Sequence, residues 1–200
     1  MTRIVAGIAG GRSLDVPRSA TRPTSERVRE ALFSRLDHEG ALDEAHVLDL
    51  YAGSGALGLE AASRGAAGVV LVDRARSAAA TCLKNARRLA LPADIDVEAT
   101  TALTYLGSNH PTAMDVVFID PPYDLSEEEL TEVLRLLTLG WLAPQARIVI
   151  ERSRRSPAPI WPAGIVPEGS RRYGDTVVWF AGPTSLGTTV AGMAEGNEGS

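Results

Sequence analysis

Short runs of apolar residues alternate, through the middle of this chain, with segments whose apolar residues recur at helical spacing. Continuous apolar runs are typical of strands buried on both faces, whereas apolar residues at every third or fourth position indicate helices that cover a sheet. We expect strands at residues 46–51, 68–73, 94–99, 115–119 and 146–151. We expect helices at residues 55–64, 75–90, 101–107 and 126–138. The alternation predicts an α/β fold with a mostly parallel sheet and helices on both faces.

The N-terminal part of the chain departs from this alternation. Residues 3–16 hold two short strand-like runs about Gly10 and Gly11, which indicates a β-hairpin. A polar link follows, and then Thr24 or Ser25 can cap a helix that continues to about Asp37. The head of the chain is therefore expected to add a hairpin and one helix to the alternating core.

The C-terminal part departs in another way. The segment IVPEGSRRYGDTVVWF predicts two strands that pair as a hairpin and bring the sheet to seven strands. From Pro183 onward the sequence is small, polar and glycine-rich, which is typical of a disordered tail. We therefore divide the chain into a hairpin with a basic link at residues 1–22, one α/β domain at residues 23–182 and a tail at residues 183–200.

Composition narrows the class of protein. Apolar residues make up 44% of the chain and charged residues 22%, as in an ordinary globular domain. The single cysteine, Cys82, excludes an intramolecular disulfide and a cysteine-based zinc cluster, and the three histidines lack metal-ligand spacing. No apolar stretch approaches the roughly eighteen residues of a membrane span, and the N-terminus does not resemble a signal peptide. We expect a cytoplasmic protein without a metal site.

The net charge of −5 hides two basic segments. Residues 1–29 and residues 147–172 each hold six arginines against two acidic residues. Only Lys84 among the twenty basic residues is a lysine, which indicates a bias in codon usage. Such a bias explains the choice of arginine but not its clustering, so the pattern predicts one basic face on an acidic protein.

A glycine-rich loop follows the first strand of the alternating series, in the segment HVLDLYAGSGALGLE. Gly53, Gly55 and Gly58 have the spacing at which a backbone turns tightly and approaches a ligand at a helix N-terminus. Asp73 ends the next strand, where a carboxylate can accept both hydroxyls of a ribose. Glycines at such a turn can serve packing alone, but together with Asp73 they predict a nucleoside-bearing cofactor.

The same layout binds either NAD or S-adenosylmethionine, so the fold alone does not choose between them. Asp49 lies four residues before the first glycine, where its charge would repel a pyrophosphate. The carboxylate can instead pair, directly or through water, with the amino group of a methionine moiety. Asp49 thus favours S-adenosylmethionine, and a nicotinamide dehydrogenase is the outside alternative.

The segment DVVFIDPPYD places an acid, two prolines and a tyrosine where a buried strand ends. Ligands of a parallel sheet collect at the carboxyl ends of its strands, so this segment should face the glycine loop. Asp120 and a carbonyl of Pro121 or Pro122 can accept the two N–H groups of an aromatic amine and hold its nitrogen for attack on a methyl group. Tyr123 offers a face on which a base can stack. The plainer interpretation is a Pro-Pro turn capped by an aspartate, with the tyrosine at the rim.

These motifs resemble those of a known class of enzyme. DLYAGSGALGLE, VDR and DPPY resemble, in that order, the motifs of class I S-adenosylmethionine-dependent N-methyltransferases, which have a Rossmann-like fold. DPPY alone is shared by enzymes that methylate DNA adenine, DNA cytosine, RNA guanine or protein glutamine. The head RIVAGIAGGRSLDVPRSATRPTSERVREALFSRL and the later SRRYGDTVVWF resemble the RsmD family, so the resemblance covers residues 3–181. That family methylates the N2 of one guanine of bacterial 16S ribosomal RNA, at position 966 in the usual numbering.

The resemblance implies a role for the residues at matching positions. Contacts with the cofactor, S-adenosyl-L-methionine, are implied for Asp49, Tyr51, Gly53, Ser54, Gly55, Asp73 and Arg74. The catalytic site that holds the target base is implied at Asp120, Pro121, Pro122 and Tyr123. Ala102 and Leu103 stand where many such enzymes contact the adenine with an aspartate, so this chain would use its backbone there. Thr24 and Arg27 are expected to close over the methionine end of the cofactor.

An RNA substrate would also give the basic segments a role. Phosphate contacts are expected for Arg3, Arg12, Arg22, Arg27 and Arg29. The two arginines of the predicted first helix can instead pair with neighbouring glutamates. The target guanine must be unpaired or flipped out to reach a pocket at the rim of the sheet. The expected partner is 16S ribosomal RNA or a small-subunit assembly, with no membrane, and the chain is expected to be a monomer.

Two further functions stay open at this point. A DNA amino-methyltransferase, acting on adenine N6 or cytosine N4, would use the same acceptor motif, but the expected domains leave little to read a duplex sequence. A non-catalytic RNA-binding module on this fold is disfavoured because the cofactor and acceptor motifs are both intact.

Overall fold

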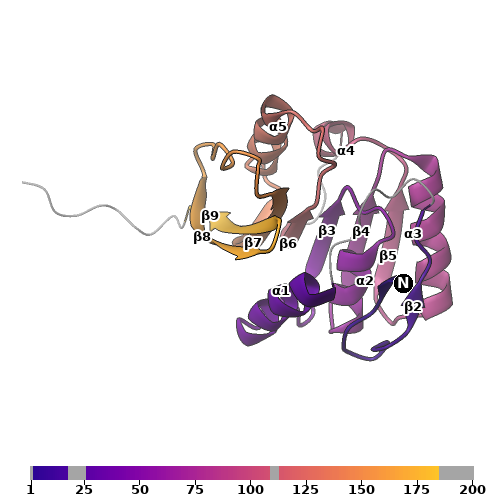
Figure 1. Ribbon diagram of the computed structural model, residues 1–200. Helices are drawn as coiled ribbons and strands as arrows, with labels where there is room; N and C mark the ends of the chain where they lie inside the picture. Colours follow the sequence, from indigo (N-terminus) through magenta and orange to yellow (C-terminus); the bar gives the residue numbers. More distant parts are fainter. Residues whose placement is uncertain (1, 18–25, 109–112, 185–200) are drawn as a thin grey trace, which may run out of the picture.

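The structure is a computed structural model that describes residues 2–17, 26–108 and 113–184. A seven-stranded sheet in the order β5-β4-β3-β6-β7-β9-β8 forms its centre (Figure 1). Its strands are β3 (His46–Leu50), β4 (Gly68–Val72), β5 (Asp94–Glu98), β6 (Met114–Ile119), β7 (Leu142–Ser153), β8 (Ile165–Tyr173) and β9 (Thr176–Pro183). The helices are α1 (Glu26–His38), α2 (Ala56–Ser63), α3 (Arg76–Leu89), α4 (Ala102–Ser108) and α5 (Glu127–Leu137). A small separate sheet pairs β1 (Thr2–Arg3) with β2 (Ser13–Leu14).

The large sheet is parallel from β5 to β7, and only β9 and β8 run antiparallel to their neighbours. From the central β3 the chain moves outward to β4 and β5, and it then crosses back to place β6 on the other side of β3. The direction of winding therefore changes between β3 and β6, and ligands of such sheets bind beside the carboxyl ends of these two strands. The predicted seven-stranded, mostly parallel Rossmann-like fold is confirmed.

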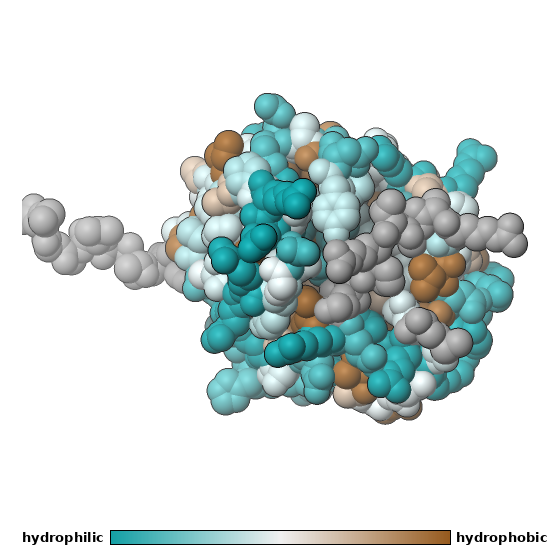
Figure 2. Space-filling view, viewed as in Figure 1, coloured by the Kyte–Doolittle hydropathy of each residue, from teal (hydrophilic) through white to brown (hydrophobic). Residues whose placement is uncertain are grey.

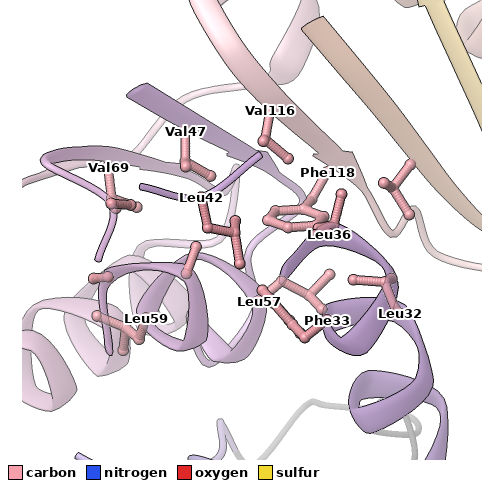
Figure 3. Packing of buried hydrophobic residues seen from close by; sticks show 14 of the residues in the cluster. Leu32, Phe33, Leu36, Leu42, Val47, Leu57, Leu59, Val69, Val116 and Phe118 are labelled. Carbon is pink, nitrogen blue, oxygen red and sulfur yellow. The ribbon is translucent and has the colours of Figure 1, made fainter. Parts of the chain in front are cut away.

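Two apolar layers cover the faces of the sheet at its central strands β3, β4 and β6, which are mostly buried. On one face, α1, α2 and α3 cover side chains such as Val47 and Phe118, and Phe118 lies against Phe33 with a ring-centroid distance of 5.5 Å (Figure 3). On the other face, α4 and α5 cover Leu48 and Val117. Leu48 directly follows Val47 in the sequence, and Val117 directly precedes Phe118. Successive side chains of a central strand thus enter opposite layers, and both layers are apolar. The sequence of such a strand is therefore a continuous apolar run, not an alternation of apolar and polar residues.

The N-terminal hairpin exists, but its strands have only two residues each, so most of the strand-like residues between 3 and 16 do not pair. The intervening residues turn onto α2, where the buried carboxylate of Glu60 accepts hydrogen bonds from Val5 N (2.6 Å) and Ala6 N (3.0 Å). Gly7 has φ 77° and lies so close to α2 that a Cβ would meet the Ser63 carbonyl oxygen at 1.9 Å. The backbone therefore bonds to a helix where the sequence pattern predicted strand pairing.

The C-terminal hairpin is confirmed, with Tyr173 paired to Thr176 across its turn. β7 begins four residues earlier than expected, and its pairing with β6 is irregular between Met114 and Val116. The expected helix cap at Thr24 or Ser25 and residues 185–200 of the expected tail lie outside the described residues. Pro183, where the tail was expected to begin, instead ends β9 and pairs with Ile165. None of the described helices combines the length and apolar character needed to span a membrane. Hydrophobic side chains on the face shown in Figure 2 are scattered among hydrophilic ones.

Candidate active site

A cavity of about 370 Å³ opens at the carboxyl ends of the parallel strands, where β3 and β6 adjoin. It brings together most of the cofactor and acceptor positions expected from the sequence. These are Asp49, Tyr51, Gly53, Ser54, Asp73, Arg74, Asp120, Pro121, Pro122 and Tyr123. The cavity is also lined by residues that were not expected, among them Val16, Pro17, Glu151, Arg152, Ser153, Ser156 and Thr176.

The glycine loop makes its turn through three left-handed backbone conformations, at Tyr51 (φ 65°), Gly53 (φ 58°) and Gly55 (φ 77°). Asp73, just after β4, fixes the loop because its Oδ2 accepts a hydrogen bond from Gly53 N at 2.9 Å. The other oxygen, Oδ1, accepts from Ala75 N at 2.8 Å. The Asp73 carboxylate is thus held in one orientation beside the cavity, and its remaining lone pairs can accept hydroxyl groups.

Two of the glycines are required for packing. A Cβ on Gly58 would lie 2.4 Å from Leu71 Cδ2 and 2.8 Å from Val69 Cγ1, so only glycine lets α2 approach β4 this closely. A Cβ on Gly55 would meet both Leu59 and Leu71 at 3.1 Å. Gly55 does not line the cavity in this structure. The packing and ligand interpretations of the loop therefore apply to different glycines.

Asp49 is an acid that the fold buries beside the cavity. Its side chain is 1% exposed, and its Oδ2 accepts a hydrogen bond from Gly58 N at 2.8 Å. Burial raises the pKa of Asp49 to about 8; the Gly58 N–H opposes this shift, and the nearby charges of Asp120 and Asp73 add to it. Among the described residues, Asp49 Oδ1 has no hydrogen-bond partner. A buried acceptor of this kind, facing a cavity, fits a ligand that carries an ammonium group.

The acceptor segment leaves β6 and crosses the end of β3. Asp120 N contacts the Leu50 carbonyl at 3.4 Å, and the Pro122 carbonyl accepts a hydrogen bond from Leu125 N at 3.1 Å. The Pro121 carbonyl is consequently the better candidate to accept a hydrogen bond from a ligand. Tyr123 is 63% exposed at the mouth of the cavity, which is unusual for an aromatic ring and suits a stacking face.

Two links to neighbouring elements were not visible in the sequence. The buried Asn85 of α3 donates from Nδ2 to the Ser54 carbonyl and to the Asp15 carbonyl, both at 2.9 Å, and its Oδ1 accepts from Asp15 N at 2.9 Å. It thereby connects the N-terminal hairpin to the glycine loop. Arg152 of β7 is 7% exposed and pairs with Glu127 at the start of α5.

Glu151 and Arg152 do carry a signal in the sequence. The predicted strand at residues 146–151 ends at Glu151, and Arg152 follows it, so the rule that pointed to Asp120 also points to them. In the structure both lie just beyond Ile150, the last residue of β7 that pairs with β6.

The expected RNA contact at Arg29 is wrong. Its side chain is 1% exposed and its Nη1 lies 3.9 Å from the buried Glu60 carboxylate, so it cannot reach a phosphate. Arg12 donates to the carbonyls of Arg88 and Leu89, the latter at 2.7 Å, and so binds the C-terminal end of α3. Arg3 pairs with Glu26 at the surface. Phosphate contacts by Arg3 and Arg12 stay predictions.

Several other expected positions are not brought to the cavity. Ala102 and Leu103, at the start of α4, do not line it, and Ala102 is packed in the core. Arg27 is exposed on α1 and is likewise not among the lining residues. Arg22 and Thr24 lie outside the described residues.

Comparison with known proteins identifies the family of the chain. Residues 2–182 match the family described as Conserved hypothetical protein 95. Ribosomal RNA small subunit methyltransferase D of Escherichia coli K12 is 40% identical over 163 residues, which cover 80% of this chain and 79% of that protein. The protein of the same name from Haemophilus influenzae is 36% identical over 159 residues, covering 78% and 80%. The solved structure of yhhF from Escherichia coli has a TM-score of 0.81 at 34% identity, covering 92% of this chain and 99% of that one.

Proposed function

Because the chain belongs to the RsmD family of methyltransferases, we propose that it transfers a methyl group from S-adenosyl-L-methionine to the exocyclic N2 of one guanine of 16S ribosomal RNA. One observation carries the proposal. The segment Asp120–Tyr123 lines the same cavity as the glycine loop and Asp73, so an amine acceptor site adjoins a nucleoside site.

The residues of the cavity fit S-adenosylmethionine, which supplies an activated methyl group on a sulfonium. Asp49 Oδ1 is the acceptor for the amino group of the methionine part, and Asp73 is the acceptor for the ribose hydroxyls. Gly53 and Ser54 offer a turn without bulk on the side that faces the cavity. We propose Ala102 and Leu103 as the backbone contacts of the adenine, and Thr24 and Arg27 as later contacts of the methionine end.

On the acceptor side, the amine of guanine is a weak nucleophile because its lone pair is delocalised into the ring. Asp120 accepts one of its N–H groups and the Pro121 carbonyl accepts the other. Two fixed acceptors hold the nitrogen in one orientation and stabilise the positive charge that develops on it. Stacking on Tyr123 fixes the plane of the base. No strong general base is needed, because the N–H becomes acidic only as the new bond forms.

We propose 16S ribosomal RNA or a small-subunit assembly as the partner and the cytoplasm as the location, since the substrate is found there. We also propose that the chain acts as a monomer. A DNA amino-methyltransferase would use the same acceptor pair. The DNA alternative is not favoured, because the named relatives are ribosomal RNA methyltransferases.

The first experiment compares two binding reactions by calorimetry. The purified protein should bind S-adenosylmethionine, and exclusive binding of NADH would contradict the proposal. The second maps modified nucleotides of 16S ribosomal RNA by mass spectrometry in a strain that lacks the gene. One methylguanine should be missing and should return when the gene is restored.

Substitution of Asp120 tests the acceptor role directly. Asp120→Ala should abolish turnover while leaving affinity for S-adenosylmethionine largely intact. Asp124→Ala is the matched control, because Asp124 lies in the same segment but is exposed and does not line the cavity. Wild-type turnover by Asp120→Ala would remove the acceptor role.

A further inference from the structure

A second carboxylate lies beside Asp120 at the rim of the sheet. In the pairing of β6 with β7, Ile119 is opposite Ile150, so Asp120 and Glu151 follow as the next neighbours along the two strands. Adjacent strands lie about 4.8 Å apart. Both residues line the same cavity. The acceptor segment therefore has a partner on the adjoining strand.

The two side chains also emerge on the same face of the sheet. Side chains alternate along a strand, and Phe118 and Val149 both belong to the core under α1, α2 and α3, where Figure 3 shows Phe118 above Phe33 and Leu36. Two residues further along, Asp120 and Glu151 share that side. The charge of Asp120 contributes to the raised pKa of Asp49, a residue that α2 contacts from the same side.

The surroundings of Glu151 are polar and partly closed to water. Its Oε2 is buried from solvent. Burial lowers the pKa of Arg29, and the carboxylates of Glu60, Glu26 and Glu151 oppose that shift. The buried guanidinium of Arg29 on α1 thus lies within electrostatic reach of Glu151. This arrangement suits a carboxylate that is held in place beside the cavity that it lines.

Two adjacent carboxylates match only one of the bases that carry an exocyclic amine. Guanine presents two donors side by side, the N1–H and the N2 amine. Adenine presents its N6 amine next to N1, which is an acceptor, and cytosine presents its N4 amine next to N3, also an acceptor. A second carboxylate beside the amine site would repel the lone pair of adenine or cytosine, and a wrong contact at a buried polar site is strongly disfavoured.

We propose that Glu151 determines base specificity by accepting the N1–H of the target guanine while Asp120 accepts an N–H of its N2 amine. This inference rests on the proposed methylation of guanine and adds a residue to it. It explains how an Asp-Pro-Pro-Tyr segment, which suits several amines, can be restricted to guanine by the neighbouring strand.

The test uses two versions of one RNA. 16S ribosomal RNA is joined from a synthetic fragment that carries either guanine or 2,6-diaminopurine at the target position, and it is assembled with small-subunit proteins. Both bases have the N2 amine, but N1 of diaminopurine is an acceptor. Wild-type protein should show a kcat/KM at least about tenfold higher for guanine RNA than for diaminopurine RNA. With diaminopurine, Glu151 would lose the hydrogen bond from N1–H and would face the lone pair of N1 instead. In Glu151→Gln the amide can donate to N1, so the ratio should fall by about tenfold or reverse.

The ratio is measured within each variant, so differences in active fraction cancel. Glu168→Gln is the control: Glu168 lies on β8, pairs with Arg35 at 3.1 Å and does not line the cavity, so its ratio should equal that of the wild type. An unchanged ratio in Glu151→Gln, including an equal loss on both RNAs, would overturn the inference. If Glu151→Gln does not fold, the test is the kcat/KM ratio of the wild-type protein. Equal kcat/KM values on the two RNAs would then exclude the role of Glu151. Failure of the wild type on guanine RNA would instead remove the proposed function.

Discussion

Asp49→Asn should make the ligand-free protein more stable at neutral pH while weakening cofactor binding. Asn keeps the shape of the side chain and can still accept the hydrogen bond from Gly58 N, which Asp49 accepts at 2.8 Å. It removes an ionisable group whose pKa rises from an ordinary 3.8 to about 8 on folding, mainly because it is buried.

The magnitude follows from the proton that the folded state retains. Between pH 3.8 and 8 the folded protein holds a proton on Asp49 that the unfolded chain releases, so the free energy of unfolding falls as pH rises through this window. The slope is about 1.4 kcal/mol per pH unit, which gives a cost of about 4 kcal/mol at pH 7. Because the new amide also needs partners, we expect a net gain of about 2–4 kcal/mol for Asp49→Asn at pH 7 and almost none at pH 4.

The assay is urea unfolding of ligand-free wild type and variant at several pH values from 4 to 8. Asp43→Asn is the control, because Asp43 is exposed and lies outside the cavity. Asp43→Asn should not reproduce the gain in stability that is expected for Asp49→Asn at pH 7. A difference for Asp49→Asn that is constant across the range would refute the reasoning, since it would mean that Asp49 is not protonated in the folded state.

Binding of S-adenosylmethionine supplies an independent readout. If the Asp49 carboxylate receives the amino group of the cofactor, binding at pH 7 should release a proton. Calorimetry in buffers of different ionisation enthalpy would detect it in the wild type and not in Asp49→Asn. Equal proton release by both proteins would assign the proton to another group.

Three further substitutions test the supports of the site. Gly58→Ala should lower the free energy of unfolding by about 1–3 kcal/mol in urea unfolding, because its Cβ would lie 2.4 Å from Leu71 Cδ2; an unchanged midpoint would show that α2 can move away. Asn85→Ala should cost about 2–4 kcal/mol and weaken S-adenosylmethionine binding in calorimetry, because the variant loses its bonds to Ser54 and Asp15; full affinity would leave it a structural role only. Glu60→Gln should cost about 3 kcal/mol, since it removes the carboxylate that pairs with the buried Arg29, whereas Glu132→Gln, which breaks only a solvent-accessible pair with Arg135, should cost less than about 1 kcal/mol.

The positions of the parallel strands and of the site were predictable for the same physical reason. A strand buried on both faces shows a continuous apolar run, and the polar residues that follow such runs must gather at one rim. This places Asp49, Asp73 and Asp120 together without knowledge of the helices. Glu151 ends the predicted strand at residues 146–151 and follows the same rule.

The errors concern polar residues that the fold buries. Arg29 precedes Leu32, Phe33 and Leu36 by three, four and seven positions, so helical spacing places it on the apolar face of α1. The prediction treated Arg29 only as one of a cluster of arginines and did not consider its position on the apolar face of the helix. Asn85 and Glu60 are buried among bonds to distant backbone, and such partners leave no local pattern in a sequence.

The attachment of the N-terminal segment has a consequence for the order of folding. Residues 5 and 6 bond to Glu60, 55 and 54 positions later, Asp15 bonds to Asn85, 70 positions later, and Arg12 reaches the end of α3, 77 positions later. The part of the chain that is synthesised first must therefore wait for α2 and α3 before it finds its partners. Closing such long loops slows folding, and we expect residues 2–17 to gain protection from hydrogen exchange last.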